Sequence, residues 1–166
     1  MSGTIPAILT NTPMQRSMQT VFIFDIATKT WFHQVTTESS PPDNRSGFCS
    51  VAASAEDNSS HNIYIYGGFN SNNSLDDVFI LTLPAFKWVP VYLPPEQGAT
   101  DYGRKHQCQK VYEKHMVAYR DLCVVHDLSV YDMSSLEWTT KVEVENQRYF
   151  VPERLYEIIG GKWVLT

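Results

Sequence analysis

The sequence lacks any apolar run long enough to cross a membrane, since a spanning helix needs about 18 such residues in a row. The amino terminus, MSGTIPAILTNTPMQRS, also lacks the basic start of a signal peptide. Its only apolar run, Ile5 to Leu9, is short and contains a proline. On these grounds the sequence predicts no membrane span and a cytoplasmic location by default.

Positive charge is scarce as well. The chain has 13 lysines and arginines against 18 acidic residues, which gives a net charge of −5. Binding to a phosphate backbone needs a clustered basic surface, so a nucleic-acid partner is not expected. No P-loop, dinucleotide fingerprint or GxSxG sequence is present. We therefore expect no cofactor and no catalytic residue.

Cysteine is too scarce to indicate a disulfide framework or a zinc site. Cys49, Cys108 and Cys123 are odd in number, and no two have CxxC spacing. The interpretation is three free thiols that act as small buried hydrophobes. No paired spacing typical of a metal site is found among the histidines, which are predicted to lie on the surface or in packing positions: His33, His61, His106, His115 and His126.

A three-fold repeat is what the sequence does contain. The phrases VFIFDIATKTW, VFILTLPAFKW and LSVYDMSSLEW each place a β-type run, a short turn and a tryptophan in the same order. They end at Trp31, Trp88 and Trp138, about 50 residues apart. An apolar content of 43% and an aromatic content of 13% suit a packed β protein.

Two further sequence features define the repeating unit. RSGFCSVAA begins at Arg45 and RKHQCQKVY begins at Arg104, and both place a cysteine four residues after the arginine. NIYIYGG and LYEIIGG place a glycine pair after a strand, and the second of these predicts a strand at 155–161. The best copy predicts four short strands, at 48–53, 62–66, 78–83 and 87–92.

Four strands every 50 residues or so, with glycines after the second and tryptophan on the fourth, resemble the kelch repeat, a blade of a β-propeller. The chain is most similar to the kelch proteins of filamentous fungi, over residues 21–161 and most strongly over 45–93. The resemblance implies an all-β fold, a partial kelch propeller of about three four-stranded antiparallel blades. Closed propellers have four to eight blades, so these are too few to close a ring alone.

The repeat divides the chain into five predicted segments. These are a poorly ordered tail at 1–20, the end of a first blade at 21–44, a complete blade at 45–93, a shortened and degenerate blade at 94–141, and the truncated start of a further blade at 142–166. In the shortened blade, Arg120 and Asp121 stand where the glycine pair belongs, which predicts a charged turn under backbone strain.

The resemblance also assigns roles to residues. Those expected to hold blades together are Gly67, Gly68, Trp31, Trp88, Trp138, Gly160 and Gly161. The candidates for a binding surface are Arg45, Arg104, Phe69 and Tyr102. For the two arginines, the alternatives are a channel-facing ligand surface and a structural salt bridge. Asp76 and Asp77 are expected to cap a turn through backbone hydrogen bonds rather than to act as an acid and a base.

Three functions are compatible with this resemblance. The leading hypothesis is a non-catalytic interaction module that binds a protein partner through propeller loops, with self-association through open blade edges. A carbohydrate-binding or glycan-active, galactose-oxidase-like protein of the fungal surface is the alternative, suggested by secreted relatives. It is also suggested by Asn-x-Ser sequons at Asn44, Asn58 and Asn72. The third is a truncated product without independent function.

Overall fold

The computed structural model describes residues 17–37, 41–71, 73–94, 106–121, 126–142, 144–145 and 147–160. Within them lie ten strands and one helix. The strands are β1 (Thr20–Asp25), β2 (Thr30–Val35), β3 (Cys49–Ser54), β4 (His61–Tyr66), β5 (Val78–Leu83), β6 (Lys87–Tyr92), β7 (His106–Val111), β8 (His115–Asp121), β9 (His126–Asp132) and β10 (Glu137–Thr139). The helix, α1 (Glu153–Ile159), is too short to cross a membrane, and no described helix is long enough to do so.

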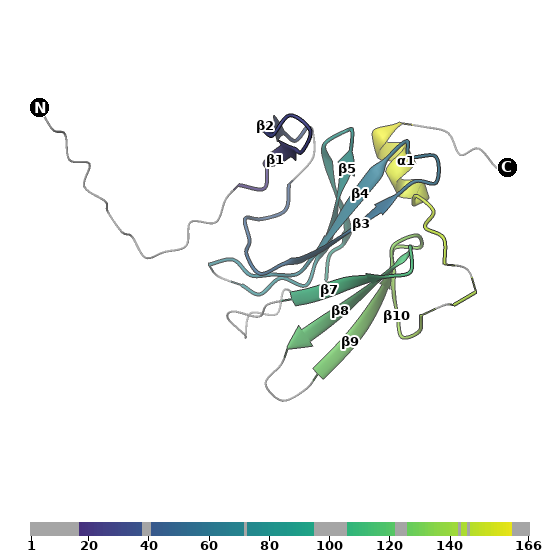
Figure 1. The fold of residues 1–166 in the computed structure, drawn as a ribbon. Coiled ribbons are helices and arrows are strands. Elements are labelled where there is room, and N and C mark those ends of the chain that lie inside the picture. The colour runs from purple at the N-terminus through teal and green to yellow at the C-terminus, as the bar shows by residue number, and fades with distance from the viewer. Residues whose placement is uncertain are drawn as a thin grey trace, which may run out of the picture.

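The strands form three antiparallel sheets in chain order. The first hairpin pairs β1 with β2, the second blade has the order β3-β4-β5-β6, and the third blade has the order β10-β9-β8-β7. Figure 1 shows the second blade between the other two sheets, with β3 beside β7. The predicted all-β, unclosed partial propeller is confirmed.

A hairpin with a loop of the same length ends each sheet. The pairs Asp25↔Thr30, Thr82↔Lys87 and Asp132↔Glu137 each close a four-residue loop. The last loop residue is left-handed in all three copies, at Lys29 (φ 55°), Phe86 (φ 52°) and Leu136 (φ 61°). This shared turn fixes the constant distance from the strand end to the tryptophan.

The apolar core lies on both faces of the second blade. Its larger cluster joins the second blade to the third and contains Val51, Tyr64, Ile80, Val89, Met116, Tyr131 and Met133. The smaller cluster, on the other face, contains Ile65, Phe79, Leu81 and Trp88, against which Met18 and Val21 of the first repeat pack. The central sheet is therefore buried from two sides, as a blade inside a propeller is.

The strand predicted at 155–161 is wrong. Glu153–Ile159 is a helix, preceded by Pro152 and followed by Gly160 with φ 76°. Leu155 is fully buried in the larger cluster, so this segment packs against the second and third blades instead of starting a new sheet. The apolar residues of the helix recur at helical spacing, a period that the glycine pair after them obscured. Gly161 lies outside the described residues.

The charged pair of the third blade does not form a turn. Arg120 and Asp121 are the last residues of β8 and pair with Asp127 and His126 of β9. The two strands are longer here than their counterparts in the second blade, with seven residues each. The prediction of a strained turn is therefore wrong, because both residues lie within a strand, which accepts any residue at these positions.

The expectation of three free thiols is also wrong. Cys49 of β3 and Cys108 of β7 form a disulfide, with their Cα atoms 5.4 Å apart. They lie on the first strands of two adjacent blades, β3 and β7, which lie side by side. The repeated arginine–cysteine spacing did not reveal this bond, because only contact between the blades brings the sulfurs together. Cys123 lies outside the described residues.

Candidate functional site

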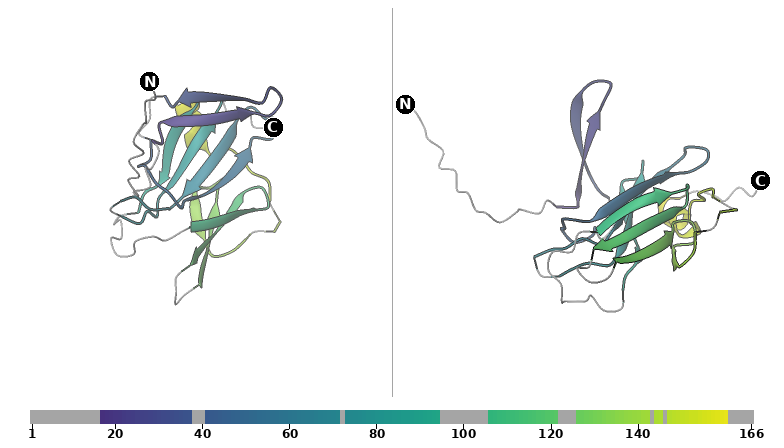
Figure 2. Two further views of the ribbon diagram at one scale, coloured as in Figure 1. Left: turned by 60° about the vertical axis from the view of Figure 1, so that its left-hand side comes forward. Right: turned by 60° about the horizontal axis from the view of Figure 1, so that its bottom comes forward.

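A cleft of about 480 Å³ lies between the second and third blades. The second blade contributes residues at the ends of β4 and β6 and in the loops that follow them, and the third contributes β9, β10 and the residue after β10. The lining consists of Tyr66, Asp76, Tyr92, Pro94, Leu128, Ser129, Trp138, Thr139 and Thr140. The cleft exists because the two sheets diverge from their contact at β3 and β7, which Figure 2 shows in its left-hand view.

An aromatic cluster forms one wall of this cleft. The ring of Trp138 lies 5.0 Å from that of Tyr66, 6.1 Å from Tyr92 and 4.9 Å from Tyr131, each at a steep angle. Edge-to-face contacts of this kind stabilise aromatic pairs beyond the area that they bury. Trp138 and Tyr92 stay partly exposed, so the wall presents rigid apolar surface to the cleft.

The rest of the cleft is polar. The hydroxyl of Tyr66 donates to Oδ1 of Asp76 over 3.4 Å, and Asp76 is only partly buried. Ser129, Thr139 and Thr140 of the third blade also line the cleft, and the Thr139 hydroxyl is bonded to the backbone of Lys141. The cleft thus combines an aromatic surface, one carboxylate and hydroxyl-bearing residues, whose hydroxyl groups both donate and accept hydrogen bonds.

Arg45 does not contribute to this cleft. Its side chain is buried and makes a bidentate ion pair with Asp77, with Nη2 3.0 Å from Oδ2. It also donates to the carbonyl oxygens of Asp43 and Gly67, and its guanidinium lies 5.5 Å from the ring centre of Phe79. Arg45 therefore forms a structural salt bridge and does not face a ligand surface, which was the other alternative. The carboxylate of Asp77 binds this arginine and does not cap the turn.

The glycine pair shapes the loop beside the ion pair. Gly67 and Gly68 have φ values of 67° and 91°, and a Cβ on Gly68 would come within 2.8 Å of the Ser46 carbonyl oxygen. The close neighbour therefore belongs to the same blade, not to the adjacent one. Phe69 follows, half-buried, and its backbone pairs with Ser46. Two other binding candidates, Arg104 and Tyr102, lie outside the described residues.

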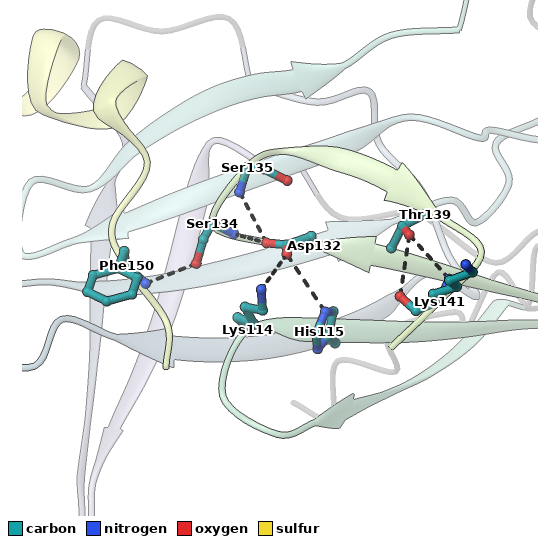
Figure 3. A network of polar contacts seen from close by, with 8 residues as sticks. All are labelled: Lys114, His115, Asp132, Ser134, Ser135, Thr139, Lys141 and Phe150. Carbon is teal, nitrogen blue, oxygen red and sulfur yellow. Dashed lines mark hydrogen bonds and ion pairs between the residues drawn. The ribbon is translucent and has the colours of Figure 1, made fainter. Parts of the chain in front are cut away.

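A polar network on the third blade is centred on Asp132 (Figure 3). Its Oδ1 accepts hydrogen bonds from the backbone amides of Ser134 and Ser135, and its Oδ2 lies 3.0 Å from Nζ of Lys114. Burial works to raise the pKa of this carboxyl, but the amide hydrogen bonds and Lys114 outweigh it and hold the pKa below its usual value. Asp132 is thus ionised at neutral pH and fixes the turn between β9 and β10.

His115 lies next to this carboxylate and is fully buried. Its Nε2 is 3.7 Å from Oδ2 of Asp132, and within the described residues neither ring nitrogen makes a hydrogen bond. It lines a smaller cavity of about 230 Å³ together with Glu137 and Lys141. The described residues contain no cluster of three or more side chains able to hold a metal ion.

Three tyrosine hydroxyls are buried where the carboxy-terminal segment meets the blades. Tyr64 donates to the Met133 carbonyl over 2.7 Å and lies 3.0 Å from the hydroxyl of Tyr149, to which Asn62 donates. Burial raises the pKa of Tyr149 to about 12 and also raises the pKa values of Tyr64 and Tyr131 above that of a free tyrosine. These phenols are neutral at physiological pH and have a structural role.

Sequence reasoning placed the binding candidates differently. Trp138 was expected to hold blades together, and it does contact the second blade, but it also lines the cleft. The sequence did not identify Tyr92 and Asp76 as cleft residues, because the cleft forms only where two blades meet. The one feature of the sequence that could have indicated them is their position at the end of a blade strand or in the loop after it.

Two of the three sequons can be placed. Asn44 and Asn58 are exposed, in the segment before β3 and in the loop between β3 and β4. Asn58 adopts a left-handed conformation with φ 56°, which asparagine tolerates well. Asn72 is outside the described residues.

Comparison with known proteins agrees with the repeat. The family model for the KLHDC2/KLHL20/DRC7 Kelch-repeats domain matches residues 10–156. A Kelch repeat-containing protein of Arthroderma benhamiae is 31% identical over 137 residues, which cover 73% of this chain and 19% of that protein. The chain therefore spans about a fifth of the length of this relative.

Proposed function

This chain belongs to the kelch-repeat family, and we propose that it is a non-catalytic module that binds a partner protein at the cleft between its second and third blades. Kelch repeats are typically interaction modules, and the cleft is the observation that carries the proposal here. Tyrosine and tryptophan dominate the binding energy of protein interfaces, and Tyr92 and Trp138 are partly exposed in this cleft. Their rings are held by other rings, so little side-chain entropy is lost on binding.

The partner that fits is an extended protein segment with an apolar side chain beside a basic one. The apolar side chain would pack on Trp138 and Tyr92. The basic residue would lie near Asp76, whose carboxylate sits at the cleft of a chain with net charge −5. The hydroxyls of Ser129 and Thr140 are placed to bond the backbone of the segment, which supplies affinity independent of its sequence.

Selection from a displayed library of short random peptides on the purified chain tests this function. Peptides rich in apolar and basic residues should be recovered. Tyr92→Ala should weaken their binding by about tenfold, equal to about 1.4 kcal/mol. Asp76→Asn, which keeps the shape of the side chain, should weaken the basic peptides selectively. Tyr112→Ala is the matched control, since Tyr112 is exposed in the loop between β7 and β8, away from the cleft lining.

Two results would count against the cleft. Peptides that bind all three variants as well as they bind the parent chain would place the interaction elsewhere. Recovery of no peptide from a chain that melts cooperatively by circular dichroism would contradict protein binding through this cleft. A chain without a cooperative melt would instead support a truncated product without function of its own.

Carbohydrate binding is the second candidate, and the same lining favours it. Aromatic rings next to hydroxyl groups can stack on and hydrogen-bond a sugar, as Trp138 and Thr140 could. A glycan array decides between the two functions. Glycans retained by the parent chain and lost with Tyr92→Ala, in the absence of any selected peptide, would replace the protein-binding proposal.

The site of action is part of the proposal as well. The Cys49–Cys108 disulfide supports an oxidising compartment rather than the cytoplasm expected by default, because cytosolic thiols are kept reduced. Exposed Asn44 and Asn58 are compatible with such a compartment. Alkylation of free thiols in intact cells, followed by mass spectrometry, checks it: Cys49 and Cys108 should resist alkylation until a reductant is added.

A further inference from the structure

The loop between β3 and β4 carries an exposed asparagine. Residues 58–60 read Asn-Ser-Ser, an Asn-x-Ser sequon, in which the asparagine side chain accepts an N-linked glycan in a secreted protein. Asn58 is exposed, and among the described residues none forms a hydrogen bond with its side chain. The side-chain amide of Asn58 is therefore available for modification.

The shape of this loop does not depend on the Asn58 side chain. The backbone amide of Asn58 donates to the Ala55 carbonyl, and the Ala55 amide donates to the Ser60 carbonyl, each over 2.9 Å. The Ser59 amide donates to Oδ1 of Asp57, also over 2.9 Å. Backbone groups and one neighbouring carboxylate thus hold the turn. A sugar attached to the Asn58 side chain would leave these bonds intact.

The sequon at Asn44 is held by the fold much more firmly. Oδ1 of Asn44 accepts a hydrogen bond from the Met18 amide over 3.3 Å. The next residue, Arg45, is buried in its ion pair with Asp77, and the third, Ser46, takes part in a β-bridge. A transferase must detach all three residues of a sequon to bind them. At Asn44 this breaks a buried ion pair, whereas at Asn58 it opens one surface turn.

We infer that Asn58 carries an N-linked glycan and that Asn44 is left largely unmodified. The inference rests on the oxidising compartment proposed for this chain, because N-glycans and disulfides both belong to secreted proteins. The donor is an oligosaccharide linked to a lipid diphosphate. The side-chain nitrogen of Asn58 loses one proton and forms a bond to C1 of the first sugar. The bond from C1 to the diphosphate oxygen breaks, and the diphosphate leaves with its electron pair.

The strand register places this glycan and the proposed binding cleft at opposite ends of the second blade. β4 begins at His61, directly after the loop that carries Asn58, and ends at Tyr66, which lines the cleft. A strand of six residues is about 20 Å long, so the sugar is attached well away from the cleft. Asn44 precedes Cys49, the partner of Tyr66 in β3, and lies at the cleft end. The inferred glycan therefore leaves the cleft open to a partner.

Peptide mapping of the protein from the cells that make it tests the site. Treatment with a peptide N-glycosidase in heavy-oxygen water converts each glycosylated asparagine to labelled aspartate. Asn58 should be labelled in most molecules, and Asn44 should be labelled about tenfold less or more rarely still. Ser60→Ala, which keeps Asn58 but destroys its sequon, should abolish the label there. Asn44→Gln is the matched control and should leave the label at Asn58 unchanged.

Several outcomes would overturn the site. An unlabelled Asn58 in molecules whose Cys49–Cys108 disulfide is intact would exclude the glycan and leave the compartment standing. Free thiols at both cysteines together with an unlabelled Asn58 would overturn both. Equal labelling of Asn44 and Asn58 would contradict selection by the fold, and a label that survives Ser60→Ala would indicate spontaneous deamidation instead. The mapping needs no peptide ligand, so failure of the glycan site and failure of the cleft can be told apart.

Discussion

The first hairpin and the second blade carry the same repeated phrase in different surroundings. Both close on a four-residue loop with a left-handed last residue, and both place a tryptophan opposite an apolar residue of the neighbouring strand. Yet Trp31 is 67% exposed and Trp88 is 5% exposed. The difference arises from the neighbour: the second blade has a repeat packed on each face, and the hairpin has one on a single face.

This contrast shows that the repeat specifies a local shape, and that contacts between repeats specify how stable it is. A turn with a capping aspartate forms from its own residues, as the hydrogen bonds from Ala27 and Thr28 to Asp25 show. Burial of the tryptophan needs a second sheet. The same side chain should therefore contribute very differently to stability in the two places.

The largest expected effect is at Trp88. Trp88→Ala should lower the free energy of unfolding by about 3–5 kcal/mol, because it empties a buried site between two repeats. Trp31→Ala should change it by no more than about 0.5 kcal/mol, because this side chain is mostly exposed. Urea denaturation followed by circular dichroism measures both. Equal losses for the two variants would break the comparison.

Loss of the disulfide should have the next largest effect on stability. The disulfide joins the second and third blades, whereas the first hairpin contains no cysteine. The two cysteines are 59 residues apart in sequence, and removing such a link by Cys108→Ser should cost about 3 kcal/mol. Reduction of the parent chain should have a similar effect on the urea midpoint. As a control, a reductant should not shift Cys108→Ser further, and an unchanged parent midpoint on reduction would contradict the link.

Gly68 and Gly160 sharpen the comparison within the repeat. Gly68→Ala should cost about 2 kcal/mol or more, since a left-handed conformation and a contact with the Ser46 carbonyl both oppose a Cβ. Gly160→Ala should cost about 1 kcal/mol, because only backbone strain acts there and no atom lies within 4 Å. Thermal melts of the two variants check the order, and a reversed order would disprove the steric account.

The smallest effect concerns the turn aspartate of the third blade. The pKa of Asp132 is lower in the folded chain than its usual value, so its stabilisation is complete above about pH 4 and is lost as pH falls through the folded value. Asp132→Asn should remove this dependence and cost less than about 1 kcal/mol at pH 7. Unfolding measured from pH 7 to pH 2 tests it. A variant that loses stability more steeply than the parent chain as pH falls would contradict this prediction.

Much of the fold follows from local pattern. Alternating apolar residues, turn residues and the spacing to each tryptophan predicted the four strands of the second blade and the tryptophan hairpin of each sheet, because a hairpin is encoded by residues close in sequence. The helix was missed for the opposite reason. Leu155 and Tyr156 suit either a strand or a helix, and the packing of Leu155 beneath the blades decides between them.

The candidate site was less predictable. Arg45 was correctly singled out as a recurring residue, but its role depends on Asp77, 32 residues away, which no local pattern links to it. The cleft depends on Trp138 meeting Tyr66 and Tyr92 across two sheets. Such contacts join residues far apart in sequence, and neither composition nor spacing predicts which of those residues will meet.

The sequence by itself determined the length of the repeat, the positions of the hairpin turns and of the glycine pair after a strand, and the family. Each of these depends on residues within one strand–turn–strand unit. Only the tertiary structure decided which tryptophan is buried, which cysteines bond, and where a cleft opens. Those outcomes depend on how one sheet is placed against the next. That placement is set by the summed packing of many apolar side chains, which no single phrase of the sequence contains.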